Sequence, residues 1–341
     1  MAGPNPNGTA LVCQACAKWP ALPSLTLARK LYAAHPLTWN TLEACRMAIT
    51  RRRGRHTGGK SRRWPLVKHI IPSTAPRTQA KYALPKSDAR PFQPYRVPLG
   101  RTTQRAAVLG DIHLPYHDRP ALQAAIASAR AWLRPDDLLF LNGDTLDFHA
   151  VSRFEKNPHA RNLKGEIDTC RAFLDHLHEQ MPKVRILWKD GNHDERLDKF
   201  VRLKAPELYD LKEIRLAELL SLEHRGIEYV TGKRPVYLGK LPVLHGHEWP
   251  TPVLGPVNAA RGLFLRAKAS AMVNHHHQTS EHTEPDVNGG IITTWSNGCL
   301  CDLHPEYAVY NKWNHGIARV EFTADSFQVS NHRIHAGKLL N

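Results

Sequence analysis

The chain has 341 residues and a mass of 38.5 kDa, which is enough for a catalytic domain with a sizeable core and an additional module. Hydrophobic residues make up 42% and charged residues 23%, as in folded globular proteins, and no run of 18 apolar residues exists that would cross a membrane. The formal net charge of +16 is concentrated at one end: residues 1–105 contain 19 Lys and Arg but two acidic residues, whereas residues 106–341 contain 28 basic and 29 acidic residues. This asymmetry indicates a basic arm on a near-neutral body.

The cysteines and the first residues bear on the cellular compartment. Six cysteines over this length do not form a disulfide framework, and the start of the chain has neither a basic nor an apolar segment of the secretory type. We therefore expect a cytoplasmic protein without membrane association. Cys13 and Cys16, with His35 and Cys45, offer a zinc knuckle as an alternative, but one Cys-x-x-Cys pair is weak evidence and favours reduced thiols.

Residues 1–56 are expected to form a basic helical module. Apolar residues recur at helical spacing in two short segments, and the second segment ends in a run of arginines. Two helices joined by a turn are typical of a helix-turn-helix, in which Arg46, Thr50 and Arg53 would share a face that meets a groove. A small docking element would show the same pattern.

Residues 57–104 are expected to be an extended basic linker. Seven prolines in this segment exclude helix interiors and central strands, and aromatic residues alternate with Lys and Arg. Together with the helical module, this composition predicts nucleic-acid binding through residues 24–63. The alternative is a tail that only keeps the protein in solution.

From residue 105 to residue 341 the pattern is that of an α/β domain. Short apolar runs, which read as buried strands, alternate with amphipathic helical segments. The predicted strands are residues 106–109, 138–141, 184–188, 243–244 and 271–273, and the predicted helices are residues 120–133 and 167–180. Polar residues follow each strand directly, at the edge where α/β proteins bind ligands.

Five short motifs stand at these strand ends. They are Asp111-Ile112-His113, Gly143-Asp144-Thr145-Leu146-Asp147, Gly191-Asn192-His193-Asp194, His245-Gly246-His247 and Asn274-His275-His276-His277. Their oxygen and imidazole groups suit Mn, Fe, Zn, Ni or Co, because Ca and Mg sites do not need histidine. Residues i and i+2 of an extended chain face the same side, so the first and last motifs can each direct two ligands to one point.

In their order and spacing, the five motifs resemble those of the calcineurin-like metallophosphoesterases, a superfamily of binuclear phosphatases and phosphodiesterases. The resemblance covers about residues 105–330, and residues 295–301 and 311–316 are similar to metallophosphoesterases encoded by phages and prophages. It implies an α/β fold, a two-sheet αββα sandwich to which the small helical N-terminal extension is attached. It also implies a hydrolase that acts on phosphate esters.

The resemblance further implies which residues hold two divalent metal ions, with Mn²⁺ expected first. Carried over by motif, the ligands of one ion are Asp111, His113 and His277, those of the other are Asn192, His245 and His275, and the bridging carboxylate is Asp144. His193 takes the position of a general acid or phosphate contact, oriented by Asp147 or Asp194.

Some positions leave a choice. We prefer His245 to His247 because it follows its strand directly, and the spacing prefers His275 and His277 to His276. Other residues near the motifs are expected to take no part: Arg196 on a helix surface, with a phosphate contact as the alternative, and Cys299 and Cys301 in a loop without a metal-binding pattern.

Two close divalent ions explain the expected reaction. They lower the pKa of a bridging water, so that a hydroxide attacks phosphorus near neutral pH, and they neutralise charge on the phosphate. An imidazole then protonates the leaving oxygen.

Because residues 1–105 carry a net charge of +17, a nucleic-acid phosphodiester is the expected substrate. The alternatives are a protein or nucleotide phosphomonoesterase that its arm localises on DNA, and a non-catalytic DNA-binding regulator.

Overall fold

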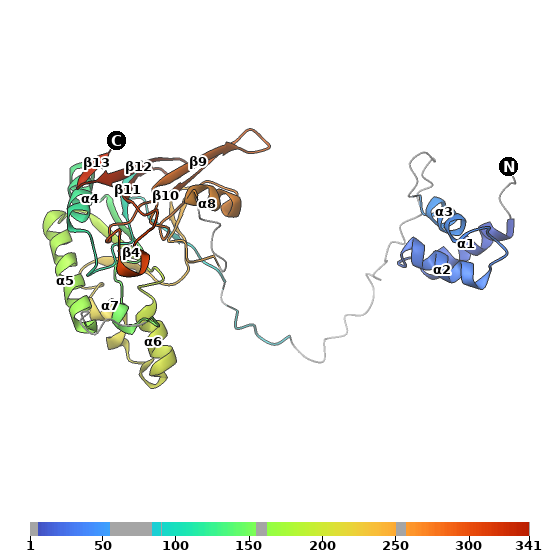
Figure 1. The fold of residues 1–341 in the computed structure, drawn as a ribbon, viewed down its shortest axis with the longest axis horizontal. Coiled ribbons are helices and arrows are strands. Elements are labelled where there is room, and N and C mark those ends of the chain that lie inside the picture. Colours follow the sequence, from blue (N-terminus) through green and yellow to red (C-terminus); the bar gives the residue numbers. More distant parts are fainter. Residues whose placement is uncertain (1–5, 55–83, 90, 155–161, 250–256, 341) are drawn as a thin grey trace. The chain divides into compact units, whose positions relative to one another are not determined.

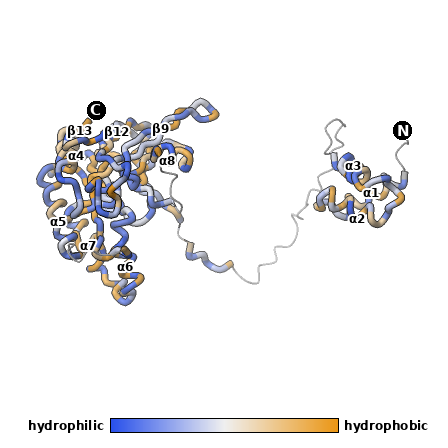
Figure 2. Tube along the Cα trace, viewed as in Figure 1, coloured by the Kyte–Doolittle hydropathy of each residue, from blue (hydrophilic) through white to orange (hydrophobic). Residues whose placement is uncertain are grey.

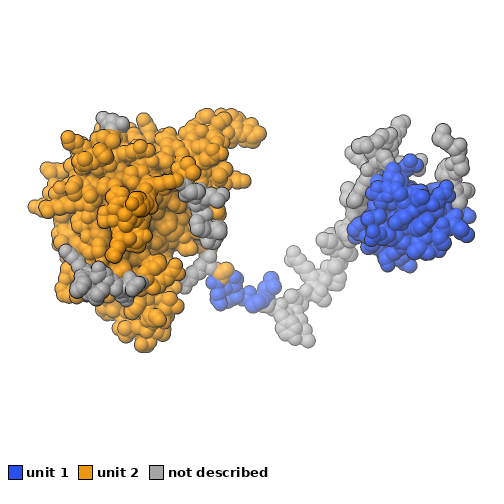
Figure 3. Space-filling view, in the orientation of Figure 1, with its two compact units in different colours: residues 1–88 blue, residues 89–341 orange. Residues whose placement is uncertain are grey.

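The computed structural model describes most of the chain in two compact units, residues 1–88 and residues 89–341 (Figures 1 and 3). The described residues are 6–54, 84–89, 91–154, 162–249 and 257–340. Most of the predicted linker, and the predicted nucleic-acid segment beyond residue 54, lie outside them. Within the described stretches, no helix has the length and apolar character needed to span a membrane.

The first unit consists of three helices around a small apolar cluster. The helices are α1 (Pro6–Lys18), α2 (Ser24–Ala34) and α3 (Leu42–Arg52). The sequence predicts only the last two, because Pro, Gly and Asn dominate the start of α1. Val12 and Cys16, four residues apart on α1, nevertheless lie in one buried cluster with Leu27, Cys45 and Ile49.

The arginines of the predicted groove-facing surface are engaged inside this unit. Arg46 pairs with Glu43 at 2.5 Å, and the Arg53 guanidinium donates to the carbonyl oxygens of Leu22 and Trp19 at 2.6 and 3.1 Å. The Arg53 guanidinium is thus held within the unit, whereas the Arg46 side chain stays 39% exposed beside Glu43, and the contact face of Arg46, Thr50 and Arg53 stays a prediction. The exposed basic residues at the end of α3 are Arg51 and Arg52.

The second unit contains two sheets, and helices cover the outer face of each. The larger sheet has the order β13 (Lys338–Leu340), β12 (Phe327–His335), β11 (His315–Phe322), β2 (Gln104–Leu109), β3 (Leu138–Asn142), β4 (Arg185–Lys189) and β5 (Ile227–Val230). The smaller sheet has the order β1 (Tyr95–Arg96), β6 (Val236–Leu238), β7 (Leu241–Leu244), β8 (Ala271–Val273), β10 (Ile291–Ser296) and β9 (Ser280–Pro285). The mixed α/β sandwich expected from the sequence is confirmed.

Alternation along the central strands produces the two apolar layers of this unit. Ala106 and Val108 of β2 lie in a buried cluster with residues of the smaller sheet, such as Val243. Ala107 and Leu109 lie instead in the cluster that packs the helices. The outer helices are α4 (Arg119–Trp132), α5 (Leu163–Gln180), α6 (Arg196–Lys204), α7 (Leu216–Leu219) and, on the smaller sheet, α8 (Ala259–Ala267) (Figure 1). In Figure 2, both hydrophobic and hydrophilic residues occur along outer helices such as α4 and α5, as expected of helices with one face on a sheet and one in solvent.

Parallel pairing brings the motif-bearing loops to the same edge. β2, β3, β4 and β5 run parallel in the larger sheet, as do β7, β8 and β10 in the smaller one. The carboxyl ends of neighbouring parallel strands meet, so the loops that follow them converge. All five predicted strands and both predicted helices are confirmed, which places the five motifs at this edge.

The folded body includes residues that the sequence assigns to the linker. Tyr95 and Arg96 form β1, which pairs parallel with β6 at the edge of the smaller sheet, and the side chain of Val97 is buried. Pro94 and Pro98 flank this strand, where the missing N–H groups are tolerated because an edge strand leaves one side unpaired.

Candidate metal centre

All seven expected metal ligands lie together at the carboxyl edge of the two sheets. They come from the loops after β2 (Asp111, His113), β3 (Asp144), β4 (Asn192), β7 (His245) and β8 (His275, His277). His245 Nε2 lies 3.2 Å from Asp144 Oδ2 and 3.3 Å from Asn192 Oδ1. On the other side of the group, His277 Nε2 lies 3.4 Å from Asp111 Oδ1, and His113 Nε2 lies 3.8 Å from Asp144 Oδ2.

Close groups of possible ligand atoms overlap in this centre, and Asp144 belongs to two of them. Asp144, His245 and His275 offer atoms within 4.8 Å of one another, and so do Asp144, His113 and His193. Asp144 thus reaches toward both groups, as a bridging carboxylate must. In the part of the chain that the structure describes, neither His247 nor His276 belongs to such a group, and His247 instead pairs with Glu195 at 3.3 Å.

Each central carboxylate uses one oxygen to fix a loop and directs the other into the centre. Asp111 Oδ2 accepts from the backbone N–H of His275, and Asp144 Oδ1 accepts from the backbone N–H of His193, both at 2.8 Å. Asp111 Oδ1 and His113 Nε2 are buried and make no hydrogen bond within the described residues, although they lie 3.4 Å from His277 Nε2 and 3.8 Å from Asp144 Oδ2, respectively. Buried polar atoms without partners are costly, and a cation between them would satisfy both.

The pKa values of the buried carboxylates and histidines also indicate a site for a cation. Burial alone would raise the pKa values of Asp111 and Asp144, yet the imidazoles of His277 and His245 hold both below the usual value. In turn, burial would lower the pKa values of these two histidines, but the carboxylates raise each to about 10. Without metal, imidazolium groups compensate the buried carboxylates, so the centre is built to receive positive charge.

The backbone at this edge is strained. Five of the seven expected ligands have a positive φ, a conformation that costs a non-glycine residue about 1–3 kcal/mol. They are Asp111 (52°), His113 (52°), Asp144 (50°), His275 (68°) and His277 (55°). These turns after β2, β3 and β8 direct the side chains inward, and such clustered strain is typical of functional sites.

Two motif glycines provide the space for this packing. A Cβ atom on Gly191 would overlap the backbone nitrogen and Oδ1 of Asp144, and one on Gly143, whose φ is 83°, would overlap the ring of His245. These positions therefore need glycine so that neighbouring ligand loops can approach each other.

Gly191→Ala is expected to displace Asp144 and to weaken metal binding by about 10–100-fold, the range seen when the support of a ligand is lost. Calorimetric titration of chelator-stripped protein with Mn²⁺ measures this. Gly100→Ala is the matched control, because no atom lies within 4 Å of the added methyl group. Equal affinities for Gly191→Ala and wild type would contradict the packing described.

A second layer of groups orients the histidines. Asp147 Oδ2 lies 3.1 Å from His113 Nδ1 and 3.2 Å from His193 Nδ1, so one carboxylate holds both rings. Arg196 donates to Asp147 Oδ1 at 3.0 Å, and its Nη2 lies 3.0 Å from His193 Nε2. The side chain of Arg196 is only 15% exposed, so the expectation of a surface arginine is wrong.

Asp194 has a different position from the one expected. It accepts from the backbone N–H groups of Leu146 and Gly191, at 3.0 and 2.9 Å, and makes no hydrogen bond to His193 within the described residues. It therefore ties the loops after β3 and β4 together, while Asp147 is the residue that orients His193.

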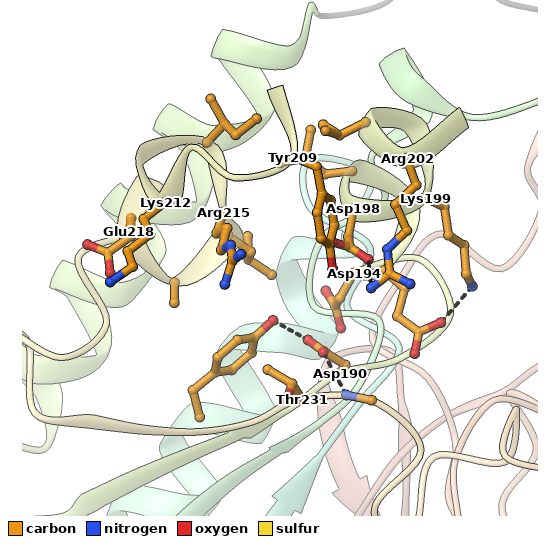
Figure 4. A pocket seen from close by; sticks show the side chains of 18 of the residues that line it. Asp190, Asp194, Asp198, Lys199, Arg202, Tyr209, Lys212, Arg215, Glu218 and Thr231 are labelled. Carbon is orange, nitrogen blue, oxygen red and sulfur yellow. Dashed lines mark hydrogen bonds and ion pairs between the residues drawn. The ribbon is translucent and has the colours of Figure 1, made fainter. Parts of the chain in front are cut away.

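On its other side, Asp194 lines a cavity of about 630 Å³ next to the centre. Lys199 and Arg202 of α6 lie on one side of this cavity and Lys212 and Arg215 on the other (Figure 4).

The structure also places residues at the centre that the sequence did not assign to it. Cys301, expected to have no metal pattern, forms a close group with His113 and His277, with its Sγ 3.8 Å from His277 Nδ1. Glu248 accepts from the backbone N–H groups of His245 and Gly246 at 2.9 and 2.6 Å. No local pattern marks either residue, because both reach the centre through tertiary packing.

Comparison with known proteins adds little to this geometry. No family model matches the chain, and no curated protein matches its sequence. Among solved structures, vacuolar protein sorting 29 from Cryptosporidium parvum has 12% identity and a TM-score of 0.37, covering 70% of this chain and 96% of its own. Nuclease MPE from Pseudomonas putida has 13% identity and a TM-score of 0.31, covering 69% and 86%. At such values the likenesses establish nothing about activity.

Proposed function

We propose that this chain is a binuclear metal-dependent phosphoesterase of the calcineurin-like type. The observation that carries the proposal is that seven N- and O-bearing side chains from five loops converge, and that Asp144 belongs to two close groups of ligand atoms among them. Asp111 Oδ1 and His113 Nε2, which are buried and make no hydrogen bond in the described structure, support it, because a cation would take up their lone pairs. The mixed N and O ligands fit Mn²⁺, with Fe, Zn, Ni or Co as alternatives.

In this proposal, Asp111, His113 and His277 would hold one ion, Asn192, His245 and His275 would hold the other, and Asp144 would serve both. When bound, the ions supply an activated water and neutralise charge on the phosphate.

His193 is proposed to act at the leaving oxygen of the ester, as a general acid or as a phosphate contact. Asp147 holds its Nδ1 at 3.2 Å, and the Arg196 guanidinium, which can only donate, lies 3.0 Å from its Nε2. Protonation of the leaving oxygen therefore requires that Arg196 turns from Nε2 to the phosphate, so that Nε2 can carry the proton. Arg196, placed by the same contacts, is suited to contact a phosphate oxygen.

A nucleic-acid phosphodiester is the proposed substrate. The net charge of +17 in residues 1–105 supports it, because such an arm attracts a polyanion. A phosphomonoesterase localised on DNA is the second candidate.

Metal dependence tests the activity. Chelation is expected to abolish hydrolysis of bis-(p-nitrophenyl) phosphate, and Mn²⁺ is expected to restore it, as measured by nitrophenolate release. Faster hydrolysis of p-nitrophenyl phosphate would favour the monoesterase. Full activity after exhaustive chelation, or inactivity on both esters with every metal tried, would contradict the proposal.

Deletion of residues 1–60 tests the arm. Wild-type affinity for DNA is expected to fall by ~10³-fold or more between 50 and 200 mM salt, as for about six phosphate contacts, and this steep dependence is expected to disappear in the deletion variant. Fluorescence anisotropy of a labelled oligonucleotide measures both. An unchanged salt dependence would show that the arm does not bind nucleic acid.

A further inference from the structure

Exposed aromatic side chains border the proposed metal centre on more than one side. Tyr307 is 78% exposed, Phe154 is 56% exposed, and Trp313 is half-buried. The Trp313 ring packs against His277 with 4.3 Å between centroids, and the Tyr307 ring lies 6.3 Å from that of Trp313. We call Phe154, Tyr307 and Trp313 the aromatic rim.

The rim also reaches the proposed general acid. The guanidinium of Arg196 lies 5.9 Å from the centre of the Phe154 ring, and its Nη2 lies 3.0 Å from His193 Nε2. Arg153 lies 5.3 Å from the same ring. Aromatic rings therefore lie next to His277, and an aromatic ring with two arginines lies close to His193.

The part of the rim beside His277 is held in a fixed conformation. The Asn311 side chain donates to the carbonyl oxygens of Leu303 and Ala308 at 2.5 and 2.6 Å, and it accepts from the backbone N–H of Trp313 at 2.7 Å. One amide thus closes the loop that carries both Tyr307 and Trp313. Rings presented on a fixed loop lose little entropy when a flat ligand stacks on them.

The chemistry of the rim points to unpaired nucleobases. Every base offers a flat face that stacks on an aromatic ring, and the adjacent arginines suit the backbone phosphates. In a duplex those faces are already covered by neighbouring bases. A rim of this kind beside a phosphodiester-cleaving centre therefore selects single strands.

We propose that the aromatic rim stacks the bases on either side of the scissile phosphate, so that the substrate is single-stranded nucleic acid. This inference rests on the proposed function, since it assigns a substrate to the same centre.

Removal of bases, with the phosphates kept, tests the inference. One substrate is a single-stranded thymidine oligonucleotide, the second has abasic residues on both sides of one diester, and the third is the first annealed to its complement. With Mn²⁺, the kcat/KM of wild type for cleavage at this diester is expected to be about tenfold or more higher in the single-stranded thymidine oligonucleotide than in the abasic or the annealed substrate. This factor is the effect of about one stacked base. Equal values on all three would overturn the inference while leaving the phosphoesterase proposal intact. Cleavage of none by protein that hydrolyses bis-(p-nitrophenyl) phosphate would refute the nucleic-acid substrate itself, and inactivity on that ester as well would refute the proposed phosphoesterase.

Substitutions in the aromatic rim test whether its rings cause the preference for the substrate with bases. Trp313→Ala and Tyr307→Ala are expected to lower the ratio of kcat/KM between the thymidine and abasic substrates toward one, and Trp313→Phe is expected to retain it. Tyr310→Ala is the control, since this neighbouring ring is fully exposed and has no ring contact in the described residues. A ratio that stays high in Trp313→Ala and Tyr307→Ala would overturn the assignment.

A measurement without metal completes the test. An oligonucleotide with 5-iodouracil, irradiated with full-length protein in excess chelator, is expected to cross-link to Trp313, Tyr307 or Phe154, as mapped by peptide mass spectrometry. Cross-links confined to residues 1–104 would contradict base stacking at the rim.

Discussion

Asp144→Asn is expected to lower kcat on bis-(p-nitrophenyl) phosphate by at least ~10³-fold. Asp144 Oδ2 faces imidazoles of both ligand groups, at 3.2 Å from His245 and 3.8 Å from His113. The amide keeps the shape of the side chain but removes the negative charge shared by the two proposed positions. A ~10³-fold decrease in kcat corresponds to a loss of about 4 kcal/mol of transition-state stabilisation.

Metal content gives an independent measurement of the same change. After dialysis against Mn²⁺, wild type is expected to retain two ions per chain and Asp144→Asn at most one, by elemental analysis. Asp325→Asn serves as the control, because its carboxylate is 85% exposed and pairs only with Lys240 in the described structure. A variant that keeps two ions and a kcat within tenfold of wild type would show that Asp144 does not bridge.

The sequence predicted the central strands and the convergence of the expected ligand residues because both depend on local pattern. An apolar run followed at once by Asp, Asn or His marks a buried strand and its carboxyl end, and parallel pairing then brings these ends together. The expectation that His275 and His277 face the same side as residues i and i+2 of an extended chain applied only in part. Both residues have a positive φ, so the chain is not extended there. Sharp turns, rather than strand alternation, direct them into the centre.

What the sequence did not predict depends on contacts between distant segments. Arg196 looks like an ordinary helix arginine until the first turn of α6 packs against the loop after β3 and brings it to Asp147. The helix α1 has an irregular composition at its start, and its buried residues find partners only on α2 and α3. Cys301 reaches His277 from a loop 24 residues further along the chain. None of these contacts has a local pattern.

The buried pair Lys189–Glu248 is a further contact of this kind, and it supports the centre directly. Lys189 Nζ, completely buried, lies 2.7 Å from Glu248 Oε1 and donates to the Asp190 carbonyl at 3.1 Å. Glu248 in turn holds the backbone N–H groups of His245 and Gly246. The pair thus connects the end of β4 in one sheet with the loop after β7 in the other.

Lys189→Met is expected to destabilise the protein by about 3–5 kcal/mol at pH 7, because it leaves the Glu248 carboxylate buried without its cation. Urea unfolding in the presence of chelator measures the difference. Lys240→Met is the matched control: its partner Asp325 is exposed, so the expected cost is at most ~1 kcal/mol. A cost below ~1 kcal/mol for Lys189→Met would mean that the two backbone N–H groups alone stabilise Glu248.

The destabilisation caused by Lys189→Met can come from the lost ion pair or from lost packing, and its pH dependence distinguishes the two. Burial would raise the pKa of Glu248, but Lys189 and His245 lower it to about 2 from its ordinary 4.5. A lowered pKa contributes stability above about pH 4.5 that is lost as the pH falls toward 2. Without Lys189 the pKa of Glu248 rises and most of this contribution disappears. The difference in free energy of unfolding between wild type and Lys189→Met is therefore expected to become smaller from pH 7 to pH 3. A difference that does not change with pH would indicate that the variant loses only the packing of the lysine side chain.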